Sequence, residues 1–255
     1  MQKRKLFISS ILLLLVCVLA GCSFGSQEKQ KEKKTADYYI GVVEDNAPYY
    51  YEAKDGTPKG YYVNLMNLLA KKYSFTYAFV PVEISSYEEN LSENGIDAFI
   101  GAMSAKTYKE STFFESEILY TSKVYALAVS GTNIRALKEA ENKGIAAVSN
   151  TEEENFAKYL ANKYEARAVA FSSMEKALSD ITNGQSQILT VDAAYYNEHL
   201  ETFKNWRCLN KSQRFQNTHK LLAKKDGKLQ SIFLEGITEL KKSGELQAAF
   251  SMTKK

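Results

Sequence analysis

IAAVSNTEEENFAKYL, residues 145–160, combines the two patterns on which the fold depends. Its first four residues are an apolar, β-prone run that predicts a strand. Thr151 and Glu154 have the spacing of a capping box, which opens a helix. Phe156 and Leu160 then repeat at helical spacing. The stretch therefore predicts a strand that leads directly into an amphipathic helix.

The same alternation extends in both directions along the chain. Turn residues fill 54–60, Asn64 is a good N-cap for a helix, and residues 229–240 form a clear amphipathic helix. Strands alternating with helices imply parallel βαβ units, hence an α/β fold, which we expect to have two lobes and a cleft at the carboxyl ends of its strands. Further strands are predicted at 38–43, 75–81, 96–100, 166–170 and 188–191.

The N-terminus has the three parts of a secretory signal. Basic residues at 3–5 precede an apolar run at 6–20, which at about 15 residues is short of the roughly 20 needed to span a bilayer. LAGC at 19–22 resembles a bacterial lipoprotein lipobox, in which Cys22 receives a diacylglyceryl group. An ordinary signal peptide, or a poor membrane span with a chance cysteine, is the alternative. We expect cleavage of residues 1–21 and a lipid anchor at the extracytoplasmic face of the cell membrane.

Polar and charged residues without apolar periodicity fill the segment that follows, and we expect a lipidated, disordered tether over 22–36. Loss of residues 1–21 would remove three of the 33 Lys and Arg residues and none of the 30 Asp and Glu residues. The remaining charges then balance, which gives no electrostatic reason to expect nucleic acid as a partner. Cys208 would be the remaining cysteine, and we expect it to be a small buried apolar residue.

Several short motifs occur in the order and near the spacing of a known family. From about residue 39 to residue 250 the chain resembles the bacterial extracellular solute-binding proteins, family 3, of polar amino-acid ABC transporters. No single motif is specific, but the ordered set is. The motifs are APY at 47–49, GYYVNL at 60–65, NGIDA at 94–98, GAMS at 101–104, KTYK at 106–109, YTS at 120–122, VD at 191–192 and SGEL at 243–246.

The resemblance implies a type 2 periplasmic-binding-protein-like fold of two α/β lobes joined at a hinge by two crossover strands. Lobe 1 would comprise residues 37–121 and 217–255, and lobe 2 residues 124–213. The crossovers would lie near Ser122-Lys123 and Gln216-Asn217. An amino acid or similar small polar solute would be trapped between the lobes and delivered to an ABC permease.

The resemblance also implies which residues hold the solute. Asp192 stands where the family has an aspartate for the α-ammonium, although an aspartate there is equally a helix N-cap. Lys109 stands at the position of the carboxylate-binding arginine, where it keeps the charge and loses the bidentate geometry; a solvated surface lysine is the alternative. The predicted ligand-binding residues are Asn46, Tyr62, Ile84, Gly101, Ala102, Ser104, Lys109, Asn150, Thr151 and Asp192.

Two features of the predicted site leave its chemistry open. Asn46 replaces an aromatic residue that is usual in the family, so one expected stacking surface is missing. Nearby tyrosines either supply a ring surface in its place or pack in the lobe 1 core, and we expect the core position for Tyr49 and Tyr61. Three glutamates at 152–154 suit the start of a helix but add negative potential beside a proposed carboxylate site. This tension favours a ligand with some positive charge.

We find no catalytic, metal-binding or cofactor-binding motif in the sequence. Transport of a solute, which the family resemblance implies, is the leading hypothesis. A sensor or accessory protein that uses the same fold without transport is the alternative, motivated by the departures at Asn46, Tyr62, Asn64 and Lys109. An enzyme is a third possibility, because relatives of the fold include dehydratases, but only Asp192 and the glutamates at 152–154 offer a cleft acid or base.

Overall fold

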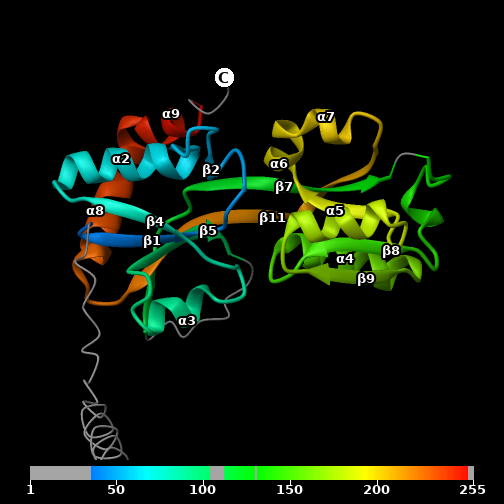
Figure 1. Ribbon diagram of the computed structural model, residues 1–255, viewed down its shortest axis with the longest axis horizontal. Coiled ribbons are helices and arrows are strands. Elements are labelled where there is room, and N and C mark those ends of the chain that lie inside the picture. The colour runs from blue at the N-terminus through cyan, green and yellow to red at the C-terminus, as the bar shows by residue number, and fades with distance from the viewer. Residues whose placement is uncertain (1–35, 104–111, 130, 252–255) are drawn as a thin grey trace, which may run out of the picture. The chain divides into compact units, whose positions relative to one another are not determined.

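The computed structural model describes residues 36–103, 112–129 and 131–251 (Figure 1). Strands and helices alternate along these residues, which confirms the α/β class. The first elements are β1 (Tyr38–Val42), β2 (Tyr51–Glu52), β3 (Pro58–Lys59), α2 (Tyr61–Tyr73), β4 (Tyr77–Pro81), α3 (Tyr87–Ser92), β5 (Ala98–Ala102) and β6 (Phe113–Glu115). They are followed by β7 (Tyr120–Ala128), a 3₁₀ turn η1 (Leu137–Glu139), β8 (Gly144–Val148), α4 (Glu152–Tyr164), β9 (Arg167–Phe171) and α5 (Met174–Thr182). The last are β10 (Ile188–Asp192), α6 (Ala193–Glu198), α7 (Leu200–Phe203), β11 (Arg207–Lys224), α8 (Lys228–Ser243) and α9 (Glu245–Ser251).

One mixed sheet connects most of these strands in the order β4-β1-β5-β11-β7-β10-β8-β9, and β6 pairs with β11. β1 is parallel to β4 and β5, and β8 is parallel to β9 and β10, so each half of the sheet contains the predicted βαβ units. β7 and β11 are antiparallel to each other and lie between the halves. β2 and β3 form a separate two-stranded sheet.

β7 and β11 run through both halves of the sheet, as Figure 1 shows. β11 is 18 residues long; it pairs with β7 from residue 207 to 219 and with β5 from 219 to 223. The residues at which we predicted the crossovers lie opposite each other, because Gln216 pairs with Lys123 and Asn217 with Ser122. The register between the two strands shifts just before these pairs.

Helices cover both faces of each half. In the first half, α2, α8 and α9 bury a core that includes Leu65, Leu69 and Phe233, while α3 packs Leu91 against the opposite face. In the second half, α4 buries Phe156, Ala157 and Leu160 against β8 and β10, so the helical spacing that predicted this face is confirmed. α5 and α7 cover the other face of that half through residues such as Ile181 and Phe203.

The start of α2 differs from the prediction. The helix begins at Tyr61 and not after Asn64, and its N-cap is Gly60, which has a φ of 115°. A side chain at residue 60 would overlap the carbonyl oxygen of Tyr49, so only glycine fits this turn. Asn64 lies inside the helix, where its Nδ2 donates to the carbonyl oxygen of Ala249 at 2.9 Å.

Cys208 also differs from the prediction, since it is exposed and not buried. It lies near the beginning of β11, beyond the core of the second half. The predicted signal peptide, Cys22 and the tether fall outside the described residues, apart from Ala36. No helix among the residues that the structure describes is both long and apolar enough to cross a membrane.

Candidate functional site

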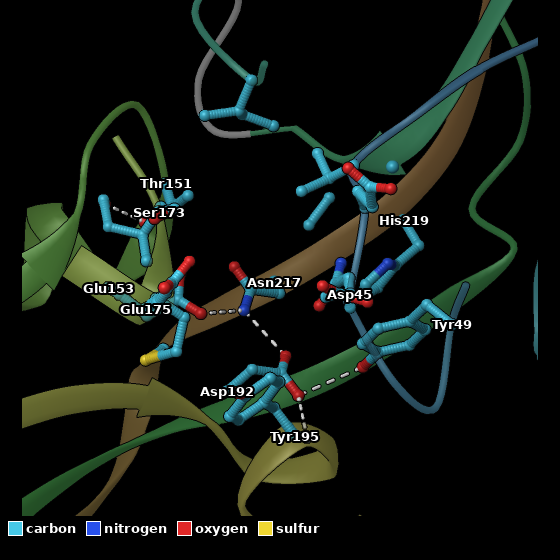
Figure 2. Close-up of a pocket in the computed structure, with 18 of the residues that line it drawn as sticks. Asp45, Tyr49, Thr151, Glu153, Ser173, Glu175, Asp192, Tyr195, Asn217 and His219 are labelled. Carbon is cyan, nitrogen blue, oxygen red and sulfur yellow. Dashed lines mark hydrogen bonds between the residues drawn. The ribbon is translucent and has the colours of Figure 1, made fainter. Parts of the chain in front are cut away.

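A cavity of about 430 Å³ lies at the carboxyl ends of β1, β5, β8 and β10, where an open α/β sheet binds ligands (Figure 2). Side chains from both halves of the sheet line it. The first half contributes the loop after β1, Tyr49, Tyr62, Ile84 and the end of β5. The second half contributes the N-termini of α4 and α5 together with Asp192, and β11 contributes Asn217 and His219.

Most of the predicted ligand-binding residues that the structure describes meet at this cavity. Asn150 is not among the lining residues; its backbone N–H donates to Glu154 Oε2 at 2.8 Å. Ser104 and Lys109 lie outside the described residues. The residues brought together are Asn46, Tyr62, Ile84, Gly101, Ala102, Thr151 and Asp192.

Asp192 is both the N-cap of α6 and a wall of the cavity, so the two roles that the sequence left open coexist. Its side chain is 5 % exposed, and both carboxylate oxygens accept hydrogen bonds. This saturation holds the carboxylate in a fixed position and stabilises its charge. The donors to Oδ1 are Ala194 N (2.7 Å), Tyr195 N (3.1 Å) and the Tyr49 hydroxyl (3.2 Å). The donors to Oδ2 are Asn217 Nδ2 (2.7 Å) and the Ser122 hydroxyl.

Asn217 connects Asp192 to a second buried carboxyl group. Its Nδ2 donates to Glu153 Oε1 at 2.9 Å as well as to Asp192 Oδ2, as Figure 2 shows. Glu153 is 6 % exposed, although it is in the first turn of α4, where a glutamate usually faces solvent. The helical spacing places Glu153, Phe156 and Ala157 on the same buried side of the helix. Two acidic side chains therefore approach the same amide group inside the cavity.

The environment of Glu153 disfavours its charged form. Burial is the main cause that raises the pKa of Glu153 to about 7, and the charge of Asp192 adds to it. The hydrogen bond from Asn217 acts in the opposite direction. Glu153 Oε2 is buried and has no hydrogen-bond partner among the described residues. This oxygen is therefore an unused acceptor that lines the cavity.

His219 is a second buried group with an unused polar atom. Its Nδ1 is 2.6 Å from the Tyr62 hydroxyl, and its ring packs on Tyr49 with 4.1 Å between ring centroids. Burial lowers the pKa of His219 to about 4, against the opposing effect of Asp192, so the ring is neutral at pH 7. His219 Nε2 is buried without a partner among the described residues. The ring therefore adds a polar group to the site without adding positive charge.

The described lining of the cavity carries negative charge. Glu44, Asp45 and Glu175 line it and are exposed, while Glu153 and Asp192 lie deeper. The charge of Asp45, from the loop after β1, acts with burial to raise the pKa of Tyr195 in α6. The two sides of the cavity are thus close enough to interact electrostatically. The described lining residues include neither lysine nor arginine.

Sequence reasoning missed several of these groups. Tyr49 was expected only in the core; it is buried there, but its hydroxyl also reaches Asp192. Asn217 was predicted only as a crossover residue, and His219 had no predicted site role. The signal that could have found Asn217 is its position: a polar residue on a crossover strand between two lobes faces whatever lies between them. The sequence alone does not distinguish Glu153 from Glu152 and Glu154 as the glutamate of the site, because that requires knowing which side of α4 is buried.

A family model, the bacterial extracellular solute-binding proteins, family 3, matches residues 38–251. The chain belongs to this family. No curated protein gives a significant sequence match. Many solved structures resemble the chain, and their fold identifies this one as a two-lobed type 2 periplasmic-binding-protein fold, with β7 and β11 as the crossover strands.

Three solved structures of similar fold illustrate the resemblance. An ancestral arginine-binding protein bound to arginine has a TM-score of 0.74 at 16 % identity, with 86 % of this chain and 98 % of that chain covered. The substrate-binding protein of an amino-acid ABC transporter has a TM-score of 0.74 at 20 % identity, with 85 % and 98 % covered. An amino-acid ABC transporter substrate-binding protein from Streptococcus pneumoniae bound to L-arginine has a TM-score of 0.71 at 19 % identity, with 85 % and 93 % covered.

Proposed function

We propose that this family 3 protein is a receptor, anchored by lipid on Cys22 to the extracytoplasmic face of the cell membrane, that binds a small polar solute and delivers it to an ABC permease. The observation that carries the proposal is the cavity itself. It lies between two lobes joined by β7 and β11, and buried polar groups from both lobes and from the crossover strands line it. A volume of about 430 Å³ suits a molecule of amino-acid size.

Binding would couple to movement of the lobes. A solute that contacts Asp45 or Tyr62 on one lobe and Glu153 or Asp192 on the other gains its full set of contacts only when the lobes are close together. Such a solute favours the closed form by its differential affinity for that form. The permease would then distinguish loaded from empty receptor by the distance between the lobes. Lobe 1 (37–121 and 217–255) and lobe 2 (124–213) are our proposed moving bodies.

Isothermal titration calorimetry of the full-length chain tests the proposal directly. The panel would contain the twenty amino acids, short peptides and aliphatic amines, each at up to millimolar concentration. We expect saturable binding of one solute per chain and a rise in melting temperature with solute concentration. Absence of binding and of any thermal shift across the whole panel would refute a transport receptor. Uptake of the bound solute by cells, and its loss when the gene is deleted, would then separate transport from sensing.

A further inference from the structure

The distribution of charge in the cavity narrows the class of solute. Five carboxyl groups line it, from Glu44, Asp45, Glu153, Glu175 and Asp192, and no described lining residue is a lysine or an arginine. His219 is neutral at pH 7 because burial lowers its pKa to about 4. An anionic group on a solute would therefore meet like charges and no described cation. A cationic group would be attracted from every side.

An unused hydrogen-bond acceptor in the buried part of the cavity also favours a cationic solute. Glu153 is 94 % buried, and its Oε2 has no hydrogen-bond partner among the described residues. Asn217 Nδ2 lies 2.9 Å from Glu153 Oε1 and 2.7 Å from Asp192 Oδ2, so the two carboxyl groups flank the same amide nitrogen. Figure 2 shows Glu153 and Asp192 on either side of Asn217. An ammonium group has three N–H donors and no acceptor, which suits Glu153 Oε2 and a neighbouring acceptor at once.

The N-terminus of α4 would be the usual place for a carboxylate of the solute. Here the buried Glu153 side chain, from the first turn of this helix, lines the cavity. The Thr151 hydroxyl at the N-cap is already engaged, since it donates to the carbonyl oxygen of Val148 at 2.6 Å. Glu154 N is also taken, since it donates to Thr151 Oγ1 at 3.4 Å. A solute carboxylate at this position would be repelled by the charged form of Glu153 and would find these two donors already engaged.

Apolar side chains share the cavity with the buried and the exposed carboxyl groups. Val43, Ile84, Val148, Met174 and Leu178 line it together with the exposed Glu44, Asp45 and Glu175. A lining of buried acids, apolar side chains and exposed acids suits a short methylene chain with a positive charge at each end. A bare metal ion would not use the apolar walls, and no three His, Cys, Asp or Glu side chains among the described residues are grouped to hold one.

We propose that the cavity binds an aliphatic diamine or a similar organic cation that has no carboxylate, with one ammonium group at Glu153 Oε2. The second ammonium group lies toward Glu44, Asp45 and Glu175. This inference rests on the proposed function and specifies the solute that the receptor carries. It also explains why a glutamate is buried at the start of α4: its charge becomes favourable once a cation is bound beside it.

A matched pair of compounds tests the inference. L-Lysine and 1,5-diaminopentane have the same carbon chain and the same two amino groups, and they differ only in the carboxylate. In calorimetry on the full-length chain at pH 8 and low salt, we expect the diamine to bind at least tenfold more tightly than L-lysine. Equal or tighter binding of L-lysine would overturn the inference and leave the proposed function intact. Binding of neither compound would also overturn it, and the wider panel would then decide the proposed function.

Two variants locate the ammonium groups. Glu153→Gln keeps the shape and removes the charge, and we expect at least a tenfold loss of affinity for 1,5-diaminopentane. Glu152→Gln is the matched control, because it makes the same change one residue earlier and outside the cavity lining. Glu175→Gln, at an exposed position, should weaken the diamine severalfold and leave 1-aminopentane unchanged. Equal effects of Glu152→Gln and Glu153→Gln, or equal effects of Glu175→Gln on both amines, would overturn the assignment.

Discussion

Replacement of Glu153 by glutamine should stabilise the solute-free protein at alkaline pH and change little at acidic pH. The pKa of Glu153 is raised from its ordinary value of 4.5 to about 7, mainly by burial. At a pH between these two values, Glu153 keeps its proton in the folded chain and has released it in the unfolded chain. Stability therefore falls as the pH rises through this interval, and the full cost of the buried charge is present above pH 7. Glutamine cannot ionise, so the variant avoids this cost.

The size of the effect follows from the same two pKa values. Each pKa unit corresponds to about 1.4 kcal/mol, so the rise from 4.5 to about 7 corresponds to a cost of about 3 kcal/mol at pH 8. Because Glu153 is buried, solvent does not screen this cost appreciably. The introduced glutamine would still accept from Asn217 through its carbonyl oxygen, which preserves the bond that Glu153 Oε1 makes now. For a domain of this size we expect a rise in melting temperature of about 5–10 °C.

Urea unfolding followed by circular dichroism, at pH 4.5, 6, 7 and 8, measures this difference. The protein should first be refolded from denaturant to remove any bound solute. The groups that line the same cavity and titrate or carry charge are Glu44, Asp45, Tyr49, Tyr62, Glu175, Asp192, Tyr195 and His219. Glu152→Gln, which leaves all of them in place, is the control and should show no such pH dependence. A difference between Glu153→Gln and the parent chain that stays constant from pH 4.5 to 8 would refute our reasoning.

Four further predictions concern other parts of the molecule. Asp192→Ala removes the N-cap of α6 and leaves the donors of Asn217 and Tyr49 without this acceptor. The free energy of unfolding in urea should therefore fall by about 3 kcal/mol, and wild-type stability would contradict this. Tyr62→Phe leaves His219 Nδ1 without its partner and should cost about 1–2 kcal/mol in the same assay, whereas Tyr51→Phe should cost nothing. Gly60→Ala forces a side chain onto the Tyr49 carbonyl at a φ of 115° and should cost about 2 kcal/mol or more by thermal unfolding. Cys22→Ala should abolish incorporation of labelled fatty acid into the protein, and persistent labelling would remove the lipid anchor at Cys22 from our proposal.

The sequence predicted the fold well because the fold depends on periodicity. Residues 145–160 showed a strand, a cap and a helix, and β8 and α4 have nearly those bounds. The start of α2 was wrong because a good N-cap residue, Asn64, outweighed Gly60, and the reason for Gly60 is a contact with the distant Tyr49. Capping preferences are local, whereas that contact is made only in the folded chain.

The site was predictable only in part, for a related reason. Asp192 was predicted because it matches, at the end of a strand, the aspartate that the family has at that position. The buried position of Glu153 depends on which side of α4 packs on the sheet. Its raised pKa depends first on that burial and then on the charge of Asp192, which is 39 residues away. Asn217 and Tyr49 come from still more distant segments. The predicted contribution of Lys109 stays a prediction.

Ser122 and Asn217 face each other across β7 and β11, and both donate to the same oxygen of Asp192. Side chains of the two strands that connect the lobes are thus hydrogen-bonded to Asp192, which lines the cavity. Any rotation of one lobe against the other must carry these bonds along or stretch them. Any movement of the lobes and the position of the Asp192 carboxylate are in this way coupled, so a solute that contacts Asp192 can act on the crossover strands without touching them.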